Sequence, residues 1–257
     1  MSKLSVLQNA HVVESKPFPH ICIENALPRK IYKELADSFP ESIVTETTPH
    51  DGGVTYRYKS NPALVDRKIP SIWQEFFQYH TSQEYFDSCV NLFEPYLERD
   101  YPGLLDQLYD GKATVRDVDN TGRYVTDCQF VVHEPVAEST TTRTPHVDNP
   151  VEIYAGLLYM KQSNDLSTGG DFTLHETNSP IVEVNKTLGR QVADNMHVPV
   201  KKVTYQANTF CMFLNVPNSV HSVSPRHGAT VRRRSINIIG EFNNSGRMWK
   251  VKEIKNK

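Results

Sequence analysis

The residues with the clearest chemical potential lie in TPHVDNP, residues 144–150, where an imidazole and a carboxylate stand two positions apart beside a proline. His146 and Asp148 could hold a metal ion, or the aspartate could cap local amides, as is common in Asp-Asn-Pro turns. With 10 histidines and 30 acidic residues in 257, about one His-x-Asp/Glu pair is expected by chance. The motif therefore needs support from elsewhere in the chain.

That support comes from a second histidine and an arginine further along the chain. His221 follows the apolar run TFCMFLN, and Arg233 follows His221 within VRRRSINIIGEF. Two imidazoles and one carboxylate on one face of an octahedral ion form the facial triad of non-heme Fe(II) oxygenases, which leaves positions open for a co-substrate and dioxygen. We therefore predict that His146, Asp148 and His221 are metal ligands and catalytic residues.

An arginine suits the co-substrate of such a centre. A 2-oxo acid that chelates iron leaves a remote carboxylate, and a guanidinium pairs with it bidentately, as a lysine cannot. Because side chains alternate along a strand, Arg233, Ser235 and Asn237 would share one polar face, with apolar residues on the other. This alternation favours Arg233 over its two arginine neighbours, although a one-residue bulge would reverse the assignment.

The elements that must position these residues begin at about residue 112. From there the chain alternates apolar and polar residues in short runs bounded by turn residues, which is typical of strands. Eight such runs predict a jelly roll or a similar barrel: KATVRDV, RYVTDCQFVV, EIYAGLLYMK, DFTLHE, KVTYQA, TFCMFLN, SVHSV and RSINIIGEF. A barrel mouth could bring a ligand pair at a turn together with a third ligand from a distant strand.

The preceding part of the chain is predicted to be mainly helical. HICIENAL predicts a strand and PRKIYKELADSFP a helix that begins near Pro28. Residues 70–110 predict two or three helices with breaks at Pro95 and Pro102. We expect residues 1–111 to pack against a core of residues 112–257 in one compact unit.

Composition narrows the range of partners and compartments. With 28 basic and 30 acidic residues the net charge is −2, so no overall field attracts nucleic acid or an anionic membrane. No segment approaches the roughly 18 apolar residues of a membrane span, and the first residues lack a signal-peptide pattern. We expect a cytoplasmic protein with a small-molecule or peptide substrate, no nucleic-acid or membrane partner, and an undetermined oligomeric state. Reduced thiols are expected at the scattered positions Cys22, Cys89, Cys128 and Cys211.

The motifs HVDNP, LLYM, STGGD, SVHSVSP and RRSINIIGEF, in this order, resemble the Fe(II)- and 2-oxoglutarate-dependent dioxygenases, in particular their prolyl 4-hydroxylase-like branch. The resemblance spans about residues 124–242. PFPHICIENALPRKIYKELADSFP is similar to the strand and helix that precede the barrel in bacterial and phage members. The resemblance implies a mainly β fold with flanking helices around a double-stranded β-helix, the jelly-roll or cupin-like core.

The resemblance also implies residue roles. His146, Asp148 and His221 would bind Fe(II), while Arg233 and Tyr159 would contact the 5-carboxylate of 2-oxoglutarate. Asn237 stands where the branch often has a hydroxyl residue, and with Ser235 it completes the cofactor-binding set. The branch commonly has a tyrosine on the strand before the His-x-Asp pair, where this chain reads CQFVVHEP. Either of two residues could replace it: Gln129 or His133.

The implied reaction consumes dioxygen and 2-oxoglutarate, with ascorbate as an optional reductant, and releases succinate and carbon dioxide. The expected outcome is hydroxylation of a C–H bond in a prolyl or other amino-acid-type substrate, peptidyl or free. An acidic third ligand supports hydroxylation, because the halogenating relatives have a small residue in place of Asp148. The alternatives are the same chemistry on another small metabolite, and a non-catalytic barrel that only binds.

Several residues around this centre carry weaker expectations. Residues 134–144 and 185–200 contain irregular stretches that could act as lids. Arg143 and Glu152 flank HVDNP and could supply pocket charge, or lie on the surface. His175 and Glu176 are expected to form a pair at the rim.

Overall fold

A long antiparallel sheet forms the centre of the computed structural model, which describes residues 2–10, 12–50, 54–119, 121–135, 143–179, 183–185, 191–243, 246–250 and 252–254. Its strand order is β1-β11-β6-β14-β4-β2, and β3 pairs with β4 in parallel. The strands of this main sheet are β1 (His20–Glu24), β2 (Thr55–Tyr58), β3 (Ala113–Val115), β4 (Tyr124–His133), β6 (Glu152–Tyr159), β11 (Thr209–Leu214) and β14 (Arg233–Phe242).

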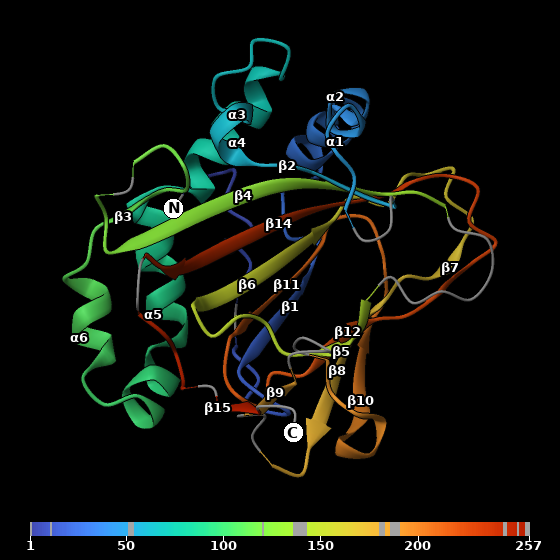
Figure 1. Ribbon diagram of the computed structural model, residues 1–257. Coiled ribbons are helices and arrows are strands. Elements are labelled where there is room, and N and C mark those ends of the chain that lie inside the picture. Colours follow the sequence, from blue (N-terminus) through green and yellow to red (C-terminus); the bar gives the residue numbers. More distant parts are fainter. Residues whose placement is uncertain are drawn as a thin grey trace.

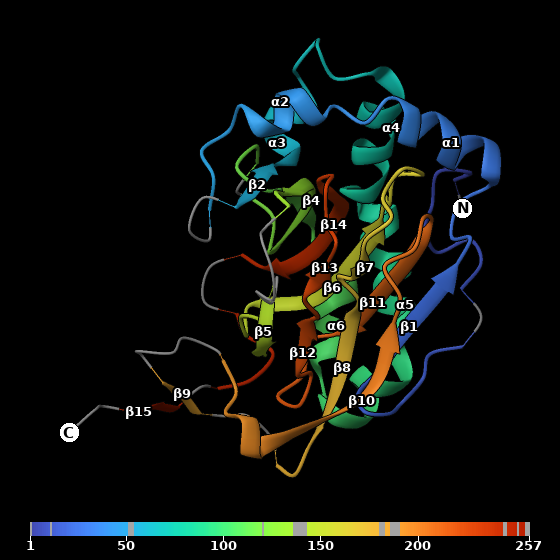
Figure 2. The same ribbon diagram turned by 90° about the vertical axis from the view of Figure 1, so that its right-hand side faces the viewer.

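A smaller antiparallel sheet lies opposite, in the order β10-β8-β12-β5, as Figures 1 and 2 show. Its strands are β5 (Arg143–His146), β8 (Phe172–Thr177), β10 (His197–Val203) and β12 (His221–Val223). Two short pairs are the remaining strands of the described residues: β7 (Thr168–Gly169) with β13 (Arg226–His227), and β9 (Glu183–Asn185) with β15 (Lys252–Ile254). The two facing sheets give the jelly-roll core that the sequence predicts.

Helices cover the face of the main sheet that points away from the minor sheet (Figure 1). They are α1 (Arg29–Asp37), α2 (Glu41–Thr45), α3 (Ser60–Ala63), α4 (Ser71–His80), α5 (Gln83–Asp100) and α6 (Leu104–Tyr109), and a short 3₁₀ turn covers Asp194–Met196. None of the helices in the described ranges is long and apolar enough to cross a membrane. The strands β1 and β2 show that residues before 112 also contribute to the main sheet.

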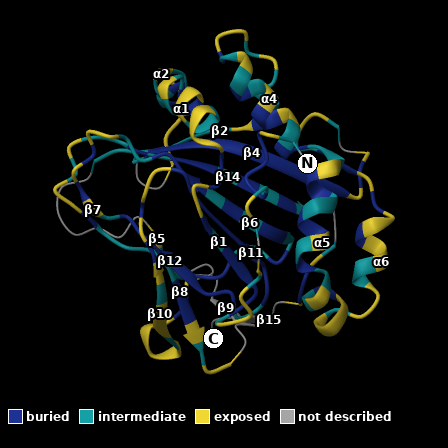
Figure 3. Ribbon diagram, turned by 180° about the vertical axis from the view of Figure 1, so that it is seen from behind, coloured by how far each residue is buried: buried dark blue, intermediate teal, exposed yellow. Residues whose placement is uncertain are grey.

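Aromatic packing fixes the helices to the sheet. The ring of Phe130 on β4 lies 4.8 Å from that of Trp73 and 4.5 Å from that of Phe77, centroid to centroid. The Trp73 indole also donates a hydrogen bond to the Leu35 carbonyl, so this buried aromatic has its polar atom satisfied. Because both faces of β4 are covered, nearly all of its residues are buried, as the dark blue of this strand in Figure 3 shows.

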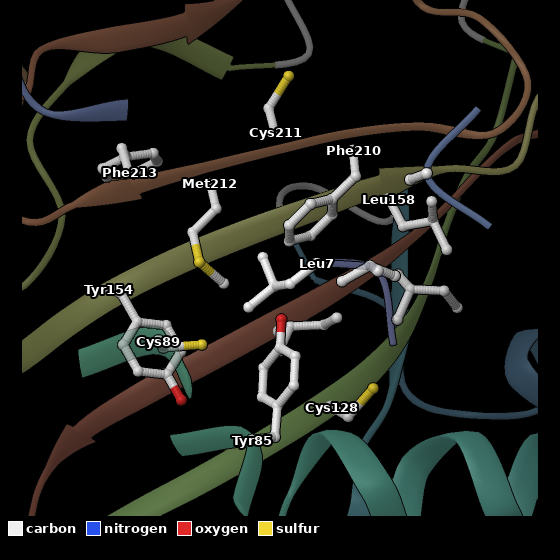
Figure 4. Packing of buried hydrophobic residues seen from close by; sticks show 14 of the residues in the cluster. Leu7, Tyr85, Cys89, Cys128, Tyr154, Leu158, Phe210, Cys211, Met212 and Phe213 are labelled. Carbon is white, nitrogen blue, oxygen red and sulfur yellow. The ribbon is translucent and has the colours of Figure 1, made fainter. Parts of the chain in front are cut away.

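A second part of the core joins α5 to β6. Ser82 caps α5 by accepting from the Tyr85 amide, and the buried side chains of the helix recur every three or four residues. Figure 4 shows Tyr85 and Cys89 of this helix beside Tyr154 of β6. All four cysteines are free thiols, and the Sγ atoms of Cys22 and Cys211 lie 3.3 Å apart on paired strands.

The prediction of a helix break at Pro95 is wrong, because α5 continues through it. Proline removes one helical hydrogen bond, at a cost of about 3 kcal/mol or more. Here its ring is exposed, while Phe93 and Leu97 on either side are buried, so packing of the inner face maintains the helix. The break expected at Pro102 is correct, since α5 ends at Asp100 and α6 begins at Leu104.

The strand expected in KVTYQA lies mostly upstream of that segment. β10 spans His197–Val203 and pairs with β8, in a stretch that the sequence suggests is an irregular loop. Pro199 obscured the pattern, and the ladder has a register shift between Pro199 and Lys201. A proline is tolerated here because β10 lies at the edge of its sheet.

Candidate metal and co-substrate site

His146 ends β5, His221 begins β12, and the two are Cα partners in the antiparallel pairing of these strands. Their ring centroids are 4.2 Å apart. Asp148, just beyond the end of β5, places Oδ1 3.5 Å from the His146 Nε2 and Oδ2 3.6 Å from the His221 Nε2. Ligands about 2.1 Å from a metal lie about 3 Å apart when adjacent, so these three side chains fit one ion with little movement.

Backbone carbonyls orient both imidazoles. The Nδ1–H of His146 donates to the Thr144 carbonyl at 2.7 Å, and that of His221 to the Ser219 carbonyl at 2.9 Å. Since a carbonyl can only accept, each Nδ1 carries the proton, which leaves the lone pair on Nε2. Outer hydrogen bonds of this kind fix the tautomer that binds a metal.

Burial keeps the second imidazole neutral. Burial first, and then the nearby His146, lower the pKa of His221 to about 4, while the Asp148 carboxylate acts in the opposite direction. At neutral pH the His221 ring is therefore an uncharged ligand. Two nitrogens and one carboxylate, without a thiolate, form a donor set that suits Fe(II), so the residues present fit a non-heme iron.

Arg233 begins β14 and is only 2% exposed. Its guanidinium carbon lies 5.1 Å from the centre of the Tyr159 ring and 4.8 Å from that of Tyr205. The two rings meet edge to face at 5.1 Å. A guanidinium held between two aromatic rings is positioned by cation–π attraction. The sequence did not indicate Tyr205, because its position beside Arg233 depends on tertiary packing.

Two glycines bring a turn against this arginine. Gly169 and Gly170, in the motif STGGD, both have positive φ, which favours glycine. A Cβ at Gly169 would lie 1.9 Å from the Pro225 carbonyl oxygen. The close approach lets the Gly170 carbonyl accept from an Nη of Arg233 at 3.4 Å.

Three buried polar atoms near Arg233 have no hydrogen-bond partner within the described ranges: the Nε of Arg233, the hydroxyl of Tyr159 and the hydroxyl of Ser235. Such atoms usually have a partner. Burial raises the pKa of Tyr159, with the Arg233 charge acting against that shift, so the phenol stays protonated and can donate. These donors fit the remote carboxylate of a 2-oxo acid.

A cavity of about 250 Å³ connects the two groups of residues. Its lining contains the triad together with Arg233, Ser235 and Asn237, which lie on one face of β14 as the alternation predicts. Tyr159 is not among the lining residues, but it is the Cα partner of Ser235 across β6 and β14 and so lies on the same sheet face. The remaining lining residues are Arg57, Val131, His133, Arg143, Glu152, Ala155, Gly156, Leu157, Phe172, Phe213, Val223 and Ile239.

Of the two candidates for the missing tyrosine, His133 lines the cavity and Gln129 does not. His133 lies opposite Arg233 in the pairing of β4 with β14, and its Nδ1 is 3.0 Å from the Thr55 hydroxyl. Burial and nearby arginines, Arg233 first, hold its pKa well below the usual value. The Gln129 amide is engaged by protein groups, accepting from Arg57 and donating to Asp127.

The expected rim pair of His175 and Glu176 is wrong. His175 is buried, with Nε2 2.8 Å from the Ser222 hydroxyl and Nδ1 3.0 Å from the Nδ1 of His197, whereas Glu176 is exposed. As neighbours on β8 their side chains point to opposite faces. Arg143 and Glu152 both line the cavity. Of the lid candidates, residues 136–142 and 186–190 lie outside the described residues.

No protein-family model matches the sequence, and no curated protein matches it. Among solved structures, the non-heme alpha-ketoglutarate-dependent epimerase SnoN from nogalamycin biosynthesis has a TM-score of 0.50 and 11% identity, over 87% of this chain and 78% of that one. A Pseudomonas putida prolyl-4-hydroxylase has a TM-score of 0.43 and 16% identity, over 88% of this chain and 93% of that one. A Trichoplax adhaerens prolyl hydroxylase, in complex with a hypoxia-inducible-factor peptide, has a TM-score of 0.43 and 15% identity, over 87% of this chain and 83% of that one. The likeness to SnoN shows a shared fold, which agrees with the two facing antiparallel sheets of the jelly-roll core.

Proposed function

We propose that this protein is an Fe(II)- and 2-oxoglutarate-dependent dioxygenase that hydroxylates a C–H bond. The observation that carries the proposal is the convergence of two independent groups on one cavity. His146, Asp148 and His221 offer metal ligands within 4.8 Å of one another. Arg233, also in the lining, has a buried Nε without a partner in the described part of the chain. A non-catalytic binding barrel has no need of both.

Each group has a distinct task in this proposal. Iron and 2-oxoglutarate, when bound, supply the oxidation of a C–H bond by dioxygen, with release of succinate and carbon dioxide. The triad holds the metal through two nitrogens and one oxygen. Arg233 binds the far carboxylate of the co-substrate, with Tyr159 and Ser235 donating to the same group. Asn237, on the same strand face, is the fourth cofactor contact.

The cavity walls keep water from the reacting centre. Phe172 and Phe213 line the cavity and lie against His221, with ring centroids 5.3 and 4.6 Å from its imidazole. Apolar rings beside a metal ligand limit solvent access and lower the local dielectric. The centre is therefore suited to hold a reactive oxidant close to a substrate carbon.

For the substrate we propose a prolyl or other amino-acid-type group, in a peptide or free. The small cavity and its mixture of arginines with one non-ligand carboxylate, Glu152, support a compact polar substrate. The same chemistry on another small metabolite is the alternative. The charge balance of the whole chain, net −2, disfavours nucleic acid.

The test is turnover of 2-oxoglutarate in air with Fe(II), with and without a panel of prolyl peptides and free amino acids. We expect slow succinate release without substrate, faster release with the correct one, and a product that gains one oxygen atom. Asp148→Ala should abolish release, and Asp110→Ala on an exposed turn should not. A folded wild-type protein that forms no succinate under any of these conditions would refute the proposal.

A further inference from the structure

Arg143, at the start of β5, contacts the metal-binding nitrogen itself. Its Nε–H donates to the Nε2 of His146 at 3.3 Å. The other ring nitrogen of His146 already donates to Thr144, so Nε2 has a single lone pair to offer. A metal ion needs that same lone pair. Binding of the metal and the hydrogen bond from Arg143 therefore exclude each other.

When a metal ion replaces this hydrogen bond on His146, the positively charged guanidinium of Arg143 is left beside the metal cation. Arg143 lines the cavity and is exposed to solvent, and within the described ranges it makes no ion pair with a carboxylate. A guanidinium does not give up its charge in a protein. Once a divalent metal occupies His146, the side chain loses its acceptor and lies next to two positive charges. An anion at this position would restore both the hydrogen bond and the charge balance.

The planar shape of the Arg143 guanidinium indicates which kind of anion would bind there. The planar fork of a guanidinium binds carboxylate or phosphate bidentately. The cavity, at about 250 Å³, must also hold the co-substrate, which favours the smaller and planar carboxylate. Arg233 is held between Tyr159 and Tyr205 and is assigned to the carboxylate of the co-substrate far from the metal. The carboxylate nearest the metal is then within the part of the cavity that Arg143 lines.

We propose that Arg143 is a carboxylate-binding residue of the metal site, which leaves His146 when the metal binds and pairs with a carboxylate beside it. The inference rests on the proposed function. Two sources share this chemistry: the carboxylate of 2-oxoglutarate nearest the metal, and the carboxylate of a free amino-acid substrate. In the second case the substrate is a free acid or a chain terminus, not an internal residue of a peptide.

The first measurement is Mn(II) affinity without 2-oxoglutarate, for wild type and Arg143→Gln. Removing both the competing donor and the positive charge should tighten Mn(II) binding several-fold. Arg99→Gln is the matched control, because it removes one exposed arginine on α5 and should leave Mn(II) affinity unchanged. Mn(II) binding that is no tighter in Arg143→Gln would overturn the proposal, whether or not 2-oxoglutarate binds.

The second measurement is carboxylate affinity of the Mn(II)-loaded protein without oxygen, by calorimetry. Arg143→Gln should weaken binding of one carboxylate about 10- to 100-fold, the range expected for a charged hydrogen-bond pair. Weaker 2-oxoglutarate binding identifies the co-substrate as the source. Unchanged 2-oxoglutarate binding, with loss of the preference for free amino acids over their amides, such as L-proline over L-prolinamide, identifies the substrate.

These results separate the two proposals. Equal binding of every carboxylate probe by wild type and Arg143→Gln would overturn the role of Arg143 while leaving the oxygenase proposal intact. Wild-type protein that binds Mn(II) but no 2-oxoglutarate would instead refute the proposed function. Arg143→Lys keeps the charge without the fork, so it should retain weak Mn(II) binding and recover only part of the carboxylate affinity.

Discussion

His146 and His221 face each other as direct partners across β5 and β12, with ring centroids 4.2 Å apart. A metal bound between them would join two strands of the minor sheet that are distant in the sequence. Metal binding is therefore coupled to the stability of this sheet, because a ligand that binds only the folded state stabilises it.

Metal removal should lower the melting temperature. At a free Mn(II) concentration about 100 times the dissociation constant, linkage predicts about 2.7 kcal/mol of added stability. Thermal unfolding of wild type with chelator and with Mn(II) measures this difference. In His146→Ala the two melting curves should coincide, whereas His227→Ala, which changes an exposed residue of β13, should retain the shift. A full shift in His146→Ala would mean that the metal binds elsewhere.

Arg233→Gln should weaken 2-oxoglutarate binding by about 2–5 kcal/mol, the usual cost of truncating one partner of a buried charged pair. The matched variant is Arg234→Gln, on the opposite strand face and paired with Glu41, which should leave co-substrate affinity unchanged. Competition binding to the metal-loaded protein gives both values. The assignment of the inward arginine fails if the second variant has the larger effect.

Tyr205 should affect 2-oxoglutarate binding by positioning the guanidinium of Arg233. Tyr205→Leu removes the ring that lies 4.8 Å from the guanidinium and should weaken 2-oxoglutarate binding by about 1 kcal/mol without changing Mn(II) affinity. Tyr205→Phe keeps the ring and loses only the hydroxyl, which donates to the Arg234 carbonyl and accepts from the Arg234 amide, so it should bind nearly as wild type. Equal losses in both variants would show that the ring is not what positions the arginine.

The buried His80 makes the free energy of unfolding depend on pH. His80 accepts from the Val6 amide and donates to the Phe76 carbonyl, and burial lowers its pKa to about 3. The unfolded chain takes up this proton near pH 6.5, so between pH 6.5 and 3 the unfolded state holds more protons and stability falls as pH falls. A full proton contributes about 1.4 kcal/mol per pH unit.

Denaturant unfolding at a series of pH values tests this contribution. Between pH 4 and 6 the slope of unfolding free energy against pH should be about 1.4 kcal/mol per unit shallower in His80→Gln than in wild type. Carboxylate contributions cancel in the difference. Identical slopes would show that His80 is protonated in the folded protein.

The sequence was most informative where function requires strict local order. Eight short alternating runs after residue 112 were sufficient to predict a jelly roll. The spacing of His146 and Asp148, the apolar run before His221 and the alternation along β14 were sufficient to predict these side chains near one another. Contacts that depend on tertiary packing could not be predicted from the sequence. Tyr205 belongs to a segment that was predicted as a strand, and its place against Arg233 depends on the fold of the chain after β10.

Edge and loop segments were the least predictable. β5 contains Pro145 and β10 contains Pro199, and proline argues against a central strand. Both strands lie at the edges of the minor sheet, where an absent amide is tolerated. Regular alternation would place Arg143 and His146, three residues apart, on opposite strand faces. The pairing of β5 with β12 has a register shift between these two positions, which allows the contact and which the local sequence did not indicate.

The most direct test of the central claim is an anaerobic titration of metal-stripped protein with Fe(II) and then 2-oxoglutarate, followed by visible absorption. The account predicts a weak charge-transfer band from the iron–2-oxoglutarate chelate in wild type. The band should be absent in His146→Ala and should need more 2-oxoglutarate in Arg233→Gln. Absence of the band in folded wild-type protein would contradict the account and favour a barrel that only binds.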